Sequence, residues 1–152
     1  MKLAEALVQR ADAQKRIEQL RKRLKLSAQV QEGEEPPENP TELLAEVERL
    51  LGEFTTLVGK INRTNLSATL ADGTTLTDAL ARRDALALHY SILSDLADAA
   101  VIETNRYSRS EIKSHPTVQV SAIRRQMDTL ATRRRELDTT IQATNWTTDL
   151  IE

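Results

Sequence analysis

The chain has no cysteine and only four glycines in 152 residues. The absence of cysteine excludes a disulfide framework, a thiolate nucleophile and a zinc–thiolate site, and it suits a reducing cytoplasm, where we expect the protein to be located. The glycines stand too far apart to build a Walker loop or a dinucleotide-binding fingerprint. They are Gly33, Gly52, Gly59 and Gly73. Nucleotide chemistry of these two kinds is therefore excluded.

Histidine is scarce as well. The two histidines, His89 and His115, do not stand at the spacing of an HExxH zinc motif. No serine lies in a G-x-S-x-G turn, and the Glu-x-x-His pair that is typical of di-iron bundles does not occur in the sequence. We therefore assign no catalytic residue, no metal ligand and no cofactor, and an enzyme is the least favoured class of function.

Aromatic residues make up 3% of the chain, so the core must be aliphatic. Nucleic-acid binding is not expected, because few aromatic side chains are present to stack on bases and the formal net charge is −2. The single tryptophan, Trp146, is followed by Leu150 and Ile151. We expect these residues to fold back together as an apolar plug.

The chain also lacks long hydrophobic segments. No apolar run reaches the roughly 18 residues that a bilayer-spanning helix needs, so no transmembrane segment is expected. The first residues include Glu5, Arg10 and Asp12, which do not fit the apolar segment of a secretory signal. We interpret this start as part of the folded protein.

Apolar residues recur at steps of three and four along most of the chain, which predicts amphipathic helices. The predicted helices cover residues 2–26, 40–61, 77–100 and 118–145. Helices of about 25 residues are each about 37 Å long, and similar lengths suit a bundle. We predict a single all-α domain, residues 1–152, folded as an antiparallel four-helix bundle of long helices.

Three connections join the predicted helices. Asp72-Gly73 lies between two stretches rich in leucine and threonine, which predicts a short β-hairpin-like connection. The other connections, residues 27–39 and 101–117, are two long end loops, and connections of this length are uncommon in compact domains unless they are functional or disordered. An up-down-up-down order places both long loops at the same end of the bundle.

The second long loop contains ETNRYSRSEIKSHP, residues 103–116, which is rich in cations, whereas the loop at 27–39 is rich in glutamate. The favoured interpretation is that the basic loop docks on the acidic loop and closes the bundle. The alternative is that the basic loop orders a small anion or a partner segment. The residues that would make those contacts are Asn105, Arg106, Arg109, Ser110, Glu111 and Lys113.

The second predicted helix carries an apolar stripe wider than one partner helix covers. Apolar residues are doubled at three places along it, Leu43-Leu44, Leu50-Leu51 and Leu57-Val58. We therefore predict a soluble homo-oligomer that buries the extra width. The alternative is that the extra width faces other helices of the same bundle.

If the apolar spacing of three and four residues is extended along each predicted helix, three arginines fall at inward-facing positions. These positions lie near one level of the predicted bundle. These arginines are Arg10, Arg83 and Arg134, and the carboxylates at a similar height are Glu53 and Glu136, with Asp84 as a further candidate. The favoured interpretation is that the carboxylates pair with the arginines and fix the helix register, or that the arginines extend to the bundle edge. The sharper hypothesis is that a small anion balances the remaining positive charge.

Several segments together resemble a known family. They are VQEGEEP, INRTN, TLTDALARRD, RYSRSEIK and the ending RRELDTTIQATNW. The chain is similar, over nearly its whole length, to a small uncharacterised bacterial family of helical proteins that are sometimes labelled septicolysin. The resemblance implies an all-helical fold and a bacterial or phage-related origin, and it supplies no catalytic residue.

Two classes of function follow from the residues and the resemblance. The favoured one is a non-enzymatic helical interaction or assembly protein, because dense mixed charge outside narrow apolar seams suits water better than lipid. The alternative is a membrane-active, cytolysin-like protein that acts through amphipathic helices. A small-anion-binding or enzymatic bundle is more remote.

Overall fold

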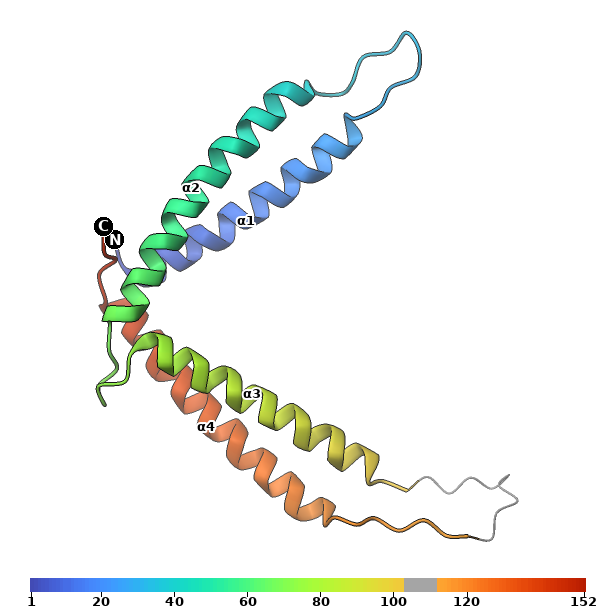
Figure 1. Ribbon diagram of the computed structural model, residues 1–152, viewed down its shortest axis with the longest axis vertical. Coiled ribbons are helices and arrows are strands. Elements are labelled where there is room, and N and C mark those ends of the chain that lie inside the picture. Colours follow the sequence, from blue (N-terminus) through green and yellow to red (C-terminus); the bar gives the residue numbers. More distant parts are fainter. Residues whose placement is uncertain (103–111) are drawn as a thin grey trace. The chain divides into compact units, whose positions relative to one another are not determined.

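The computed structural model describes residues 1–102 and 112–152, and it contains four helices (Figure 1). They are α1 (Leu3–Leu26), α2 (Pro40–Ser67), α3 (Leu76–Ala99) and α4 (Val120–Thr147). The described residues form no β-strand. The prediction of an all-helical protein with four helices is therefore confirmed. None of the helices formed by the described residues combines the length and hydropathy that a membrane span requires.

The chain divides into two compact units. One contains Met1–Thr69 together with Gln142–Glu152, and the other contains Leu70–Ile141. The antiparallel four-helix bundle and the single domain stay predictions.

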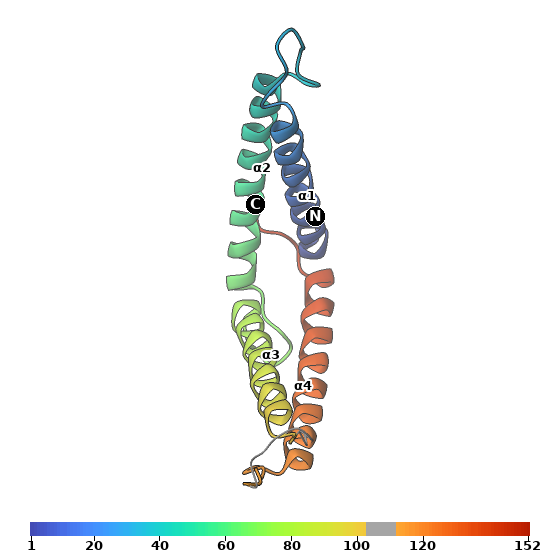
Figure 2. The same cartoon turned by 90° about the vertical axis from the view of Figure 1, so that its right-hand side faces the viewer.

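In the first unit α1 and α2 lie side by side, and residues 27–39 connect them at one end (Figures 1 and 2). The helices bury an aliphatic cluster in which Ile17, Leu24 and Val47 pack around the most buried members. Those members are Leu20, Leu43 and Leu50. These positions belong to the apolar periods of the sequence, so aliphatic burial at helical spacing holds this pair together.

Local signals set the start of α2. The Asn39 side chain accepts a hydrogen bond from the Thr41 backbone at 3.0 Å, and Pro40 occupies the first helical position. Both features were predicted from the sequence. A side-chain oxygen satisfies a free N–H group of the first turn, and proline has no backbone N–H group that would need a partner there. In the preceding connection Glu38 forms an ion pair with Arg23 near the end of α1.

The two chain ends are joined to each other in the first unit. The Leu3 backbone N–H donates to the Thr148 carbonyl, and the Leu150 N–H donates to the Met1 carbonyl, both at 2.9 Å. An ion pair between Lys2 and Asp149, 2.8 Å from Nζ to Oδ1, accompanies this backbone pairing. The C-terminal segment is thereby fixed beside the start of α1.

Trp146 does not form the predicted plug. It is 60% exposed, whereas its neighbour Asn145 is 5% exposed. Successive residues on a helix point about 100° apart, so only one of two neighbours can occupy the inward-facing position. Asn145 occupies that position, and the prediction for Trp146 was wrong.

A tight turn begins the second unit. The Gly73 N–H donates to the Leu70 carbonyl at 2.9 Å, and the Leu70 N–H donates to the Thr74 carbonyl at 2.8 Å. Gly73 has φ +83°, a conformation that L side chains rarely adopt. The Asp72 carboxylate accepts from the Thr74 backbone, which holds the pKa of Asp72 below its usual range. The turn lies where the sequence indicated one, and its β-hairpin-like character stays a prediction.

Thr75 caps α3, two residues before the threonine predicted from the sequence. Its hydroxyl oxygen accepts from the Asp78 backbone at 3.1 Å, and its O–H donates to the Asp78 carboxylate at 2.8 Å. Thr77 therefore lies inside the helix. The reciprocal bonding with Asp78 explains why the earlier threonine ends the turn and starts the helix.

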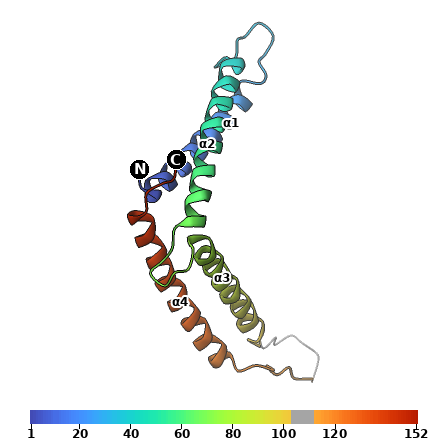
Figure 3. The ribbon, with the colours of Figure 1, turned by 60° about the vertical axis from the view of Figure 1, so that its left-hand side comes forward.

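In the second unit α3 and α4 lie side by side (Figures 1 and 3). The buried apolar residues of this unit lie mostly at the predicted helical spacing. They are Leu70, Leu76, Ala79, Leu93, Ala97, Leu130 and Ile141. Small and aliphatic side chains make up this core, as the scarcity of aromatics required.

Candidate functional site

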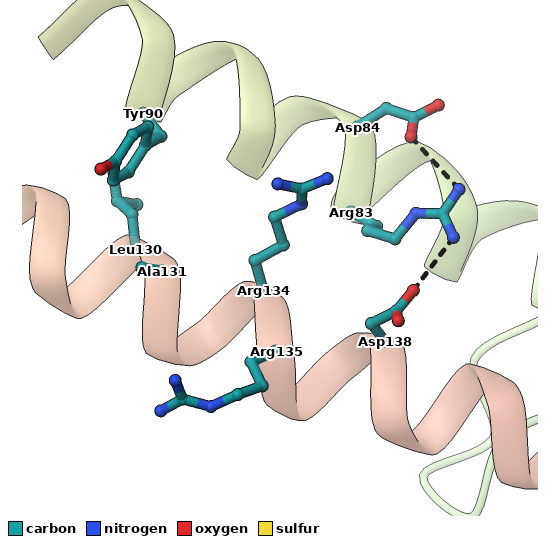
Figure 4. Close-up of a pocket in the computed structure, with 8 residues that line it drawn as sticks. All are labelled: Arg83, Asp84, Tyr90, Leu130, Ala131, Arg134, Arg135 and Asp138. Atoms are coloured by element: carbon teal, nitrogen blue, oxygen red, sulfur yellow. Dashed lines mark hydrogen bonds and ion pairs between the residues drawn. The ribbon is translucent and has the colours of Figure 1, made fainter. Parts of the chain in front are cut away.

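A cavity of about 600 Å³ lies between α3 and α4 in the second unit (Figure 4). Helix α3 contributes Arg83, Asp84 and Tyr90 to its lining. Helix α4 contributes Leu130, Ala131, Arg134, Arg135 and Asp138. The volume falls in the range of small-molecule sites.

The helical repeat explains why these residues meet. Leu130, Arg134 and Asp138 stand four residues apart, so their side chains follow one another along one face of α4. On α3, Arg83 and Tyr90 are seven residues apart, which is about two turns, and they also share a face. The cavity thus has a charged end at Arg83 and Asp138 and a less polar end at Tyr90 and Leu130, as Figure 4 shows.

Arg83 is held by two carboxylates at the charged end. Its Nη1 donates to Asp138 Oδ1 across the helix pair at 3.1 Å, and its Nη2 lies 3.6 Å from Asp84 Oδ1. The Arg83 side chain is 29% exposed. Its guanidinium therefore has its charge balanced and its position fixed within the unit.

Arg134 differs from Arg83 in having no such partner. Its side chain extends from α4 towards α3 (Figure 4), and it forms no hydrogen bond or ion pair within the part of the chain that the structure describes. Arg135 borders the same cavity, but its guanidinium points away from α3 in Figure 4. The lining thus contains three arginines and two aspartates, and both aspartates engage Arg83.

Two of the five residues predicted for a buried charge layer, Arg83 and Arg134, line this cavity. Arg83 is half-buried and Arg134 is exposed, so the two arginines are not buried as predicted. Glu136 is exposed and does not line the cavity. Asp138, which was not among the residues predicted for the layer, pairs with Arg83 in place of Glu136. The signal was present in the spacing, because Asp138 is one helical turn beyond Arg134 whereas Glu136, two residues beyond it, points to another face.

The other members of the predicted layer belong to the first unit. Arg10 is half-buried, and Glu53 is exposed and pairs with Arg49 on its own helix, 2.6 Å from Nη1 to Oε1. Convergence of all five residues in one layer stays a prediction.

The predicted end-loop site falls almost entirely outside the described residues. The members that lie there are Asn105, Arg106, Arg109, Ser110 and Glu111. Lys113 is described and is exposed to solvent. Docking of the basic loop on the acidic loop stays a prediction as well.

A second feature is an exposed apolar line along α3. Leu88 is 64% exposed, Ile92 55% and Leu96 39%, and the three stand four residues apart on one face of the helix. On α2, Leu44 and Leu51 are also exposed, at positions where the sequence predicted extra apolar width. Single exposed leucines are ordinary, but a line of large aliphatic side chains indicates an interaction surface.

Residues 10–150 match a family of unknown function, DUF6847. The chain belongs to this family. It is also similar to a solved structure described as a functionally unknown conserved protein from Corynebacterium diphtheriae. The two share 47% sequence identity with a TM-score of 0.92, and the match covers 99% of each chain. No curated protein matches the chain. These descriptions give no support to the septicolysin label.

Proposed function

We propose that the protein is a cytoplasmic, non-enzymatic helical protein that assembles with copies of itself. The observation that carries this proposal is the exposed line of Leu88, Ile92 and Leu96 on α3. Complete burial of a fully exposed side chain of this kind contributes about 1.5–3 kcal/mol. Burial of these three partly exposed side chains contributes less than that each, and it works against the entropic cost of association. The exposed leucines of α2 supply a further apolar surface in the same chain.

A second copy is the partner that the α3 line fits. The three side chains are evenly spaced along α3. When a second copy of α3 runs in the opposite direction, each side chain of one line can therefore lie opposite a side chain of the other. A two-fold axis through Ile92 then places Leu88 of one copy against Leu96 of the other. Isologous contacts of this kind are the commonest in soluble oligomers.

The proposal also treats the chain as one cooperative domain with antiparallel helices and a hairpin-like connection at the turn. The support is that α4 is a continuous helix whose residues belong to both compact units. A single unfolding transition, observed equally by circular dichroism and by Trp146 fluorescence, is the expected result. Two separate transitions would contradict it.

Light scattering on a sizing column tests assembly. We expect about twice the 17.1 kDa chain mass, and we expect Leu88→Glu combined with Ile92→Glu to return the chain mass while the helical circular dichroism is retained. A chain mass for the unaltered protein at tens of micromolar would contradict the proposal. The alternative, that the extra apolar width of α2 faces other helices of the same bundle, would then be favoured.

The membrane-active alternative has less support from the same helix. Interfacial helices are typically rich in lysine and arginine on their polar face. Helix α3 carries four aspartates and two arginines, so anionic lipid repels it. We expect no dye release from anionic liposomes at micromolar protein.

A further inference from the structure

We infer that the cavity between α3 and α4 binds a small organic monoanion, a carboxylate with an apolar body, through Arg134. This site is independent of the proposed assembly, because its lining residues are distinct from the exposed line of Leu88, Ile92 and Leu96. A carboxylate matches the planar guanidinium, which donates two parallel hydrogen bonds to it.

The first step of the argument is the difference between two arginines in one cavity. Arg83 is engaged by Asp138 and Asp84, so it forms part of the wall. Arg134 extends towards α3 and has no ion-pair partner among the residues that the structure describes (Figure 4). Its donors are therefore available to a ligand.

The second step concerns the other end of the cavity. Tyr90, Leu130 and Ala131 supply ring, methyl and methylene surface there, and Leu130 is 6% exposed, so it is fixed by packing. An inorganic ion contacting Arg134 leaves this apolar wall in water. An anion with an aromatic or aliphatic body covers it, and burial of that surface adds to binding.

The third step sets the charge of the ligand. Asp84 and Asp138 stand at the charged end of the cavity, where they engage Arg83 and leave Arg134 as the cation that extends towards α3. A single negative charge on the ligand pairs with Arg134. A second or third negative charge meets the two carboxylates and is repelled, so di- and triphosphates are disfavoured.

Titration of 3-phenylpropionate into the full-length protein, followed by calorimetry and by backbone NMR shifts, tests the inference. We expect saturable binding with the largest shifts at residues around Tyr90 and Arg134. Arg134→Gln should weaken binding about tenfold or more, which corresponds to the loss of about 1.4 kcal/mol. The uncharged analogue 3-phenylpropanol lacks the carboxylate. Its affinity for the parent protein should be no higher than the affinity of the acid for the Arg134→Gln variant.

Arg135→Gln is the matched control, because it removes the same charge from the next residue of the same helix. Its guanidinium points away from α3, so binding should be unchanged (Figure 4). Arg134 has no described partner, and we expect both variants to keep the helical circular dichroism and unfolding temperature of the parent.

Three results would overturn the inference. They are absence of saturable 3-phenylpropionate binding at millimolar concentration, equal weakening by Arg134→Gln and Arg135→Gln, and binding of inorganic phosphate as tight as that of the organic acid. The second result would indicate general charge attraction, and the third would indicate an inorganic anion site that does not use the apolar wall.

Discussion

Arg83 on α3 donates a hydrogen bond to Asp138 on α4, with 3.1 Å between Nη1 and Oδ1. The two residues are 55 positions apart in the sequence, so this contact joins the helices of the second unit through polar atoms as well as through their apolar faces. Both side chains keep some contact with water, at 29% and 45% exposure. The contact therefore specifies how the two helices pair more than it stabilises them.

Asp138→Asn should lower the free energy of unfolding by less than about 1 kcal/mol, as is typical of partly exposed ion pairs. A double-mutant cycle with Arg83→Gln in chemical denaturation measures the coupling. Asp84→Asn is the comparison, because Asp84 lies 3.6 Å from the same guanidinium and is 76% exposed. Its coupling to Arg83 should be smaller, and a larger coupling for Asp84 would contradict the assignment of Asp138 as the main partner.

Local sequence signals were sufficient to predict that the chain forms four helices, although α2 runs to Ser67, six residues beyond the end predicted at residue 61. Asn39 and Pro40 stand next to one another and define the start of α2 without any contribution from distant residues. The cap of α3 was placed two residues late, although Thr75 and Asp78 form the spacing of a reciprocal cap. Both outcomes depend on residues that are close in sequence.

The cavity could be predicted only in part, because it depends on which residues of two distant helices face one another. The sequence indicated that Arg83 and Arg134 would lie at one level, and they line one cavity. The carboxylate partner was assigned to Glu136 by height alone. The direction in which a side chain points around α4 decides which carboxylate pairs with Arg83, and Asp138 points in the right direction.

Two glycine substitutions should change stability in opposite directions. Gly73→Ala should destabilise by about 1–2 kcal/mol, because Gly73 has φ +83° and an L side chain is strained there. Gly52→Ala should stabilise by about 0.5–1 kcal/mol, because Gly52 lies inside α2 with its backbone in the helical conformation.

Apart from its chain neighbours and, for Gly52, the backbone of its own helix, neither added methyl group meets a described atom within 4 Å, so steric contact does not confuse the comparison. Thermal and denaturant unfolding of the two variants provide the measurement. The same sign of change in both variants would contradict the backbone assignment.

The joined chain ends should loosen in acid. The hydrogen bond and charge of Lys2 hold the pKa of Asp149 below its ordinary value in the folded protein. A carboxyl whose folded pKa is depressed contributes stability above its unfolded pKa, and that contribution is lost as the pH falls through the folded pKa. The loss should therefore develop below the ordinary range of aspartate.

Amide hydrogen exchange at Leu3 and Leu150, whose N–H groups join the two ends, measures this effect. Exchange corrected for its intrinsic pH dependence should increase in acid in the parent protein. In Asp149→Asn these amides should be less protected at neutral pH, and the additional acid-induced increase should disappear. An unchanged acid response in Asp149→Asn would show that another group controls the ends.

Cysteine cross-linking should identify the face through which two copies associate. The natural chain has no cysteine, so a single introduced thiol reports one position without background. Ile92 lies midway between Leu88 and Leu96, and in two oppositely directed copies of α3 it meets its own counterpart at the two-fold axis. Ile92→Cys should therefore form a disulfide-linked dimer under mild oxidation, visible on a non-reducing gel.

Ser91→Cys is the matched control, because Ser91 is also exposed but points about 100° away from Ile92 around the helix. The two sulfur atoms must approach to about 2 Å, so a thiol off the axis should cross-link far more slowly. Equal cross-linking of both variants would indicate random collision. A dimeric mass without cross-linking at Ile92 would place the interface on another face, and the exposed Leu44 and Leu51 of α2 would then be the surface to substitute.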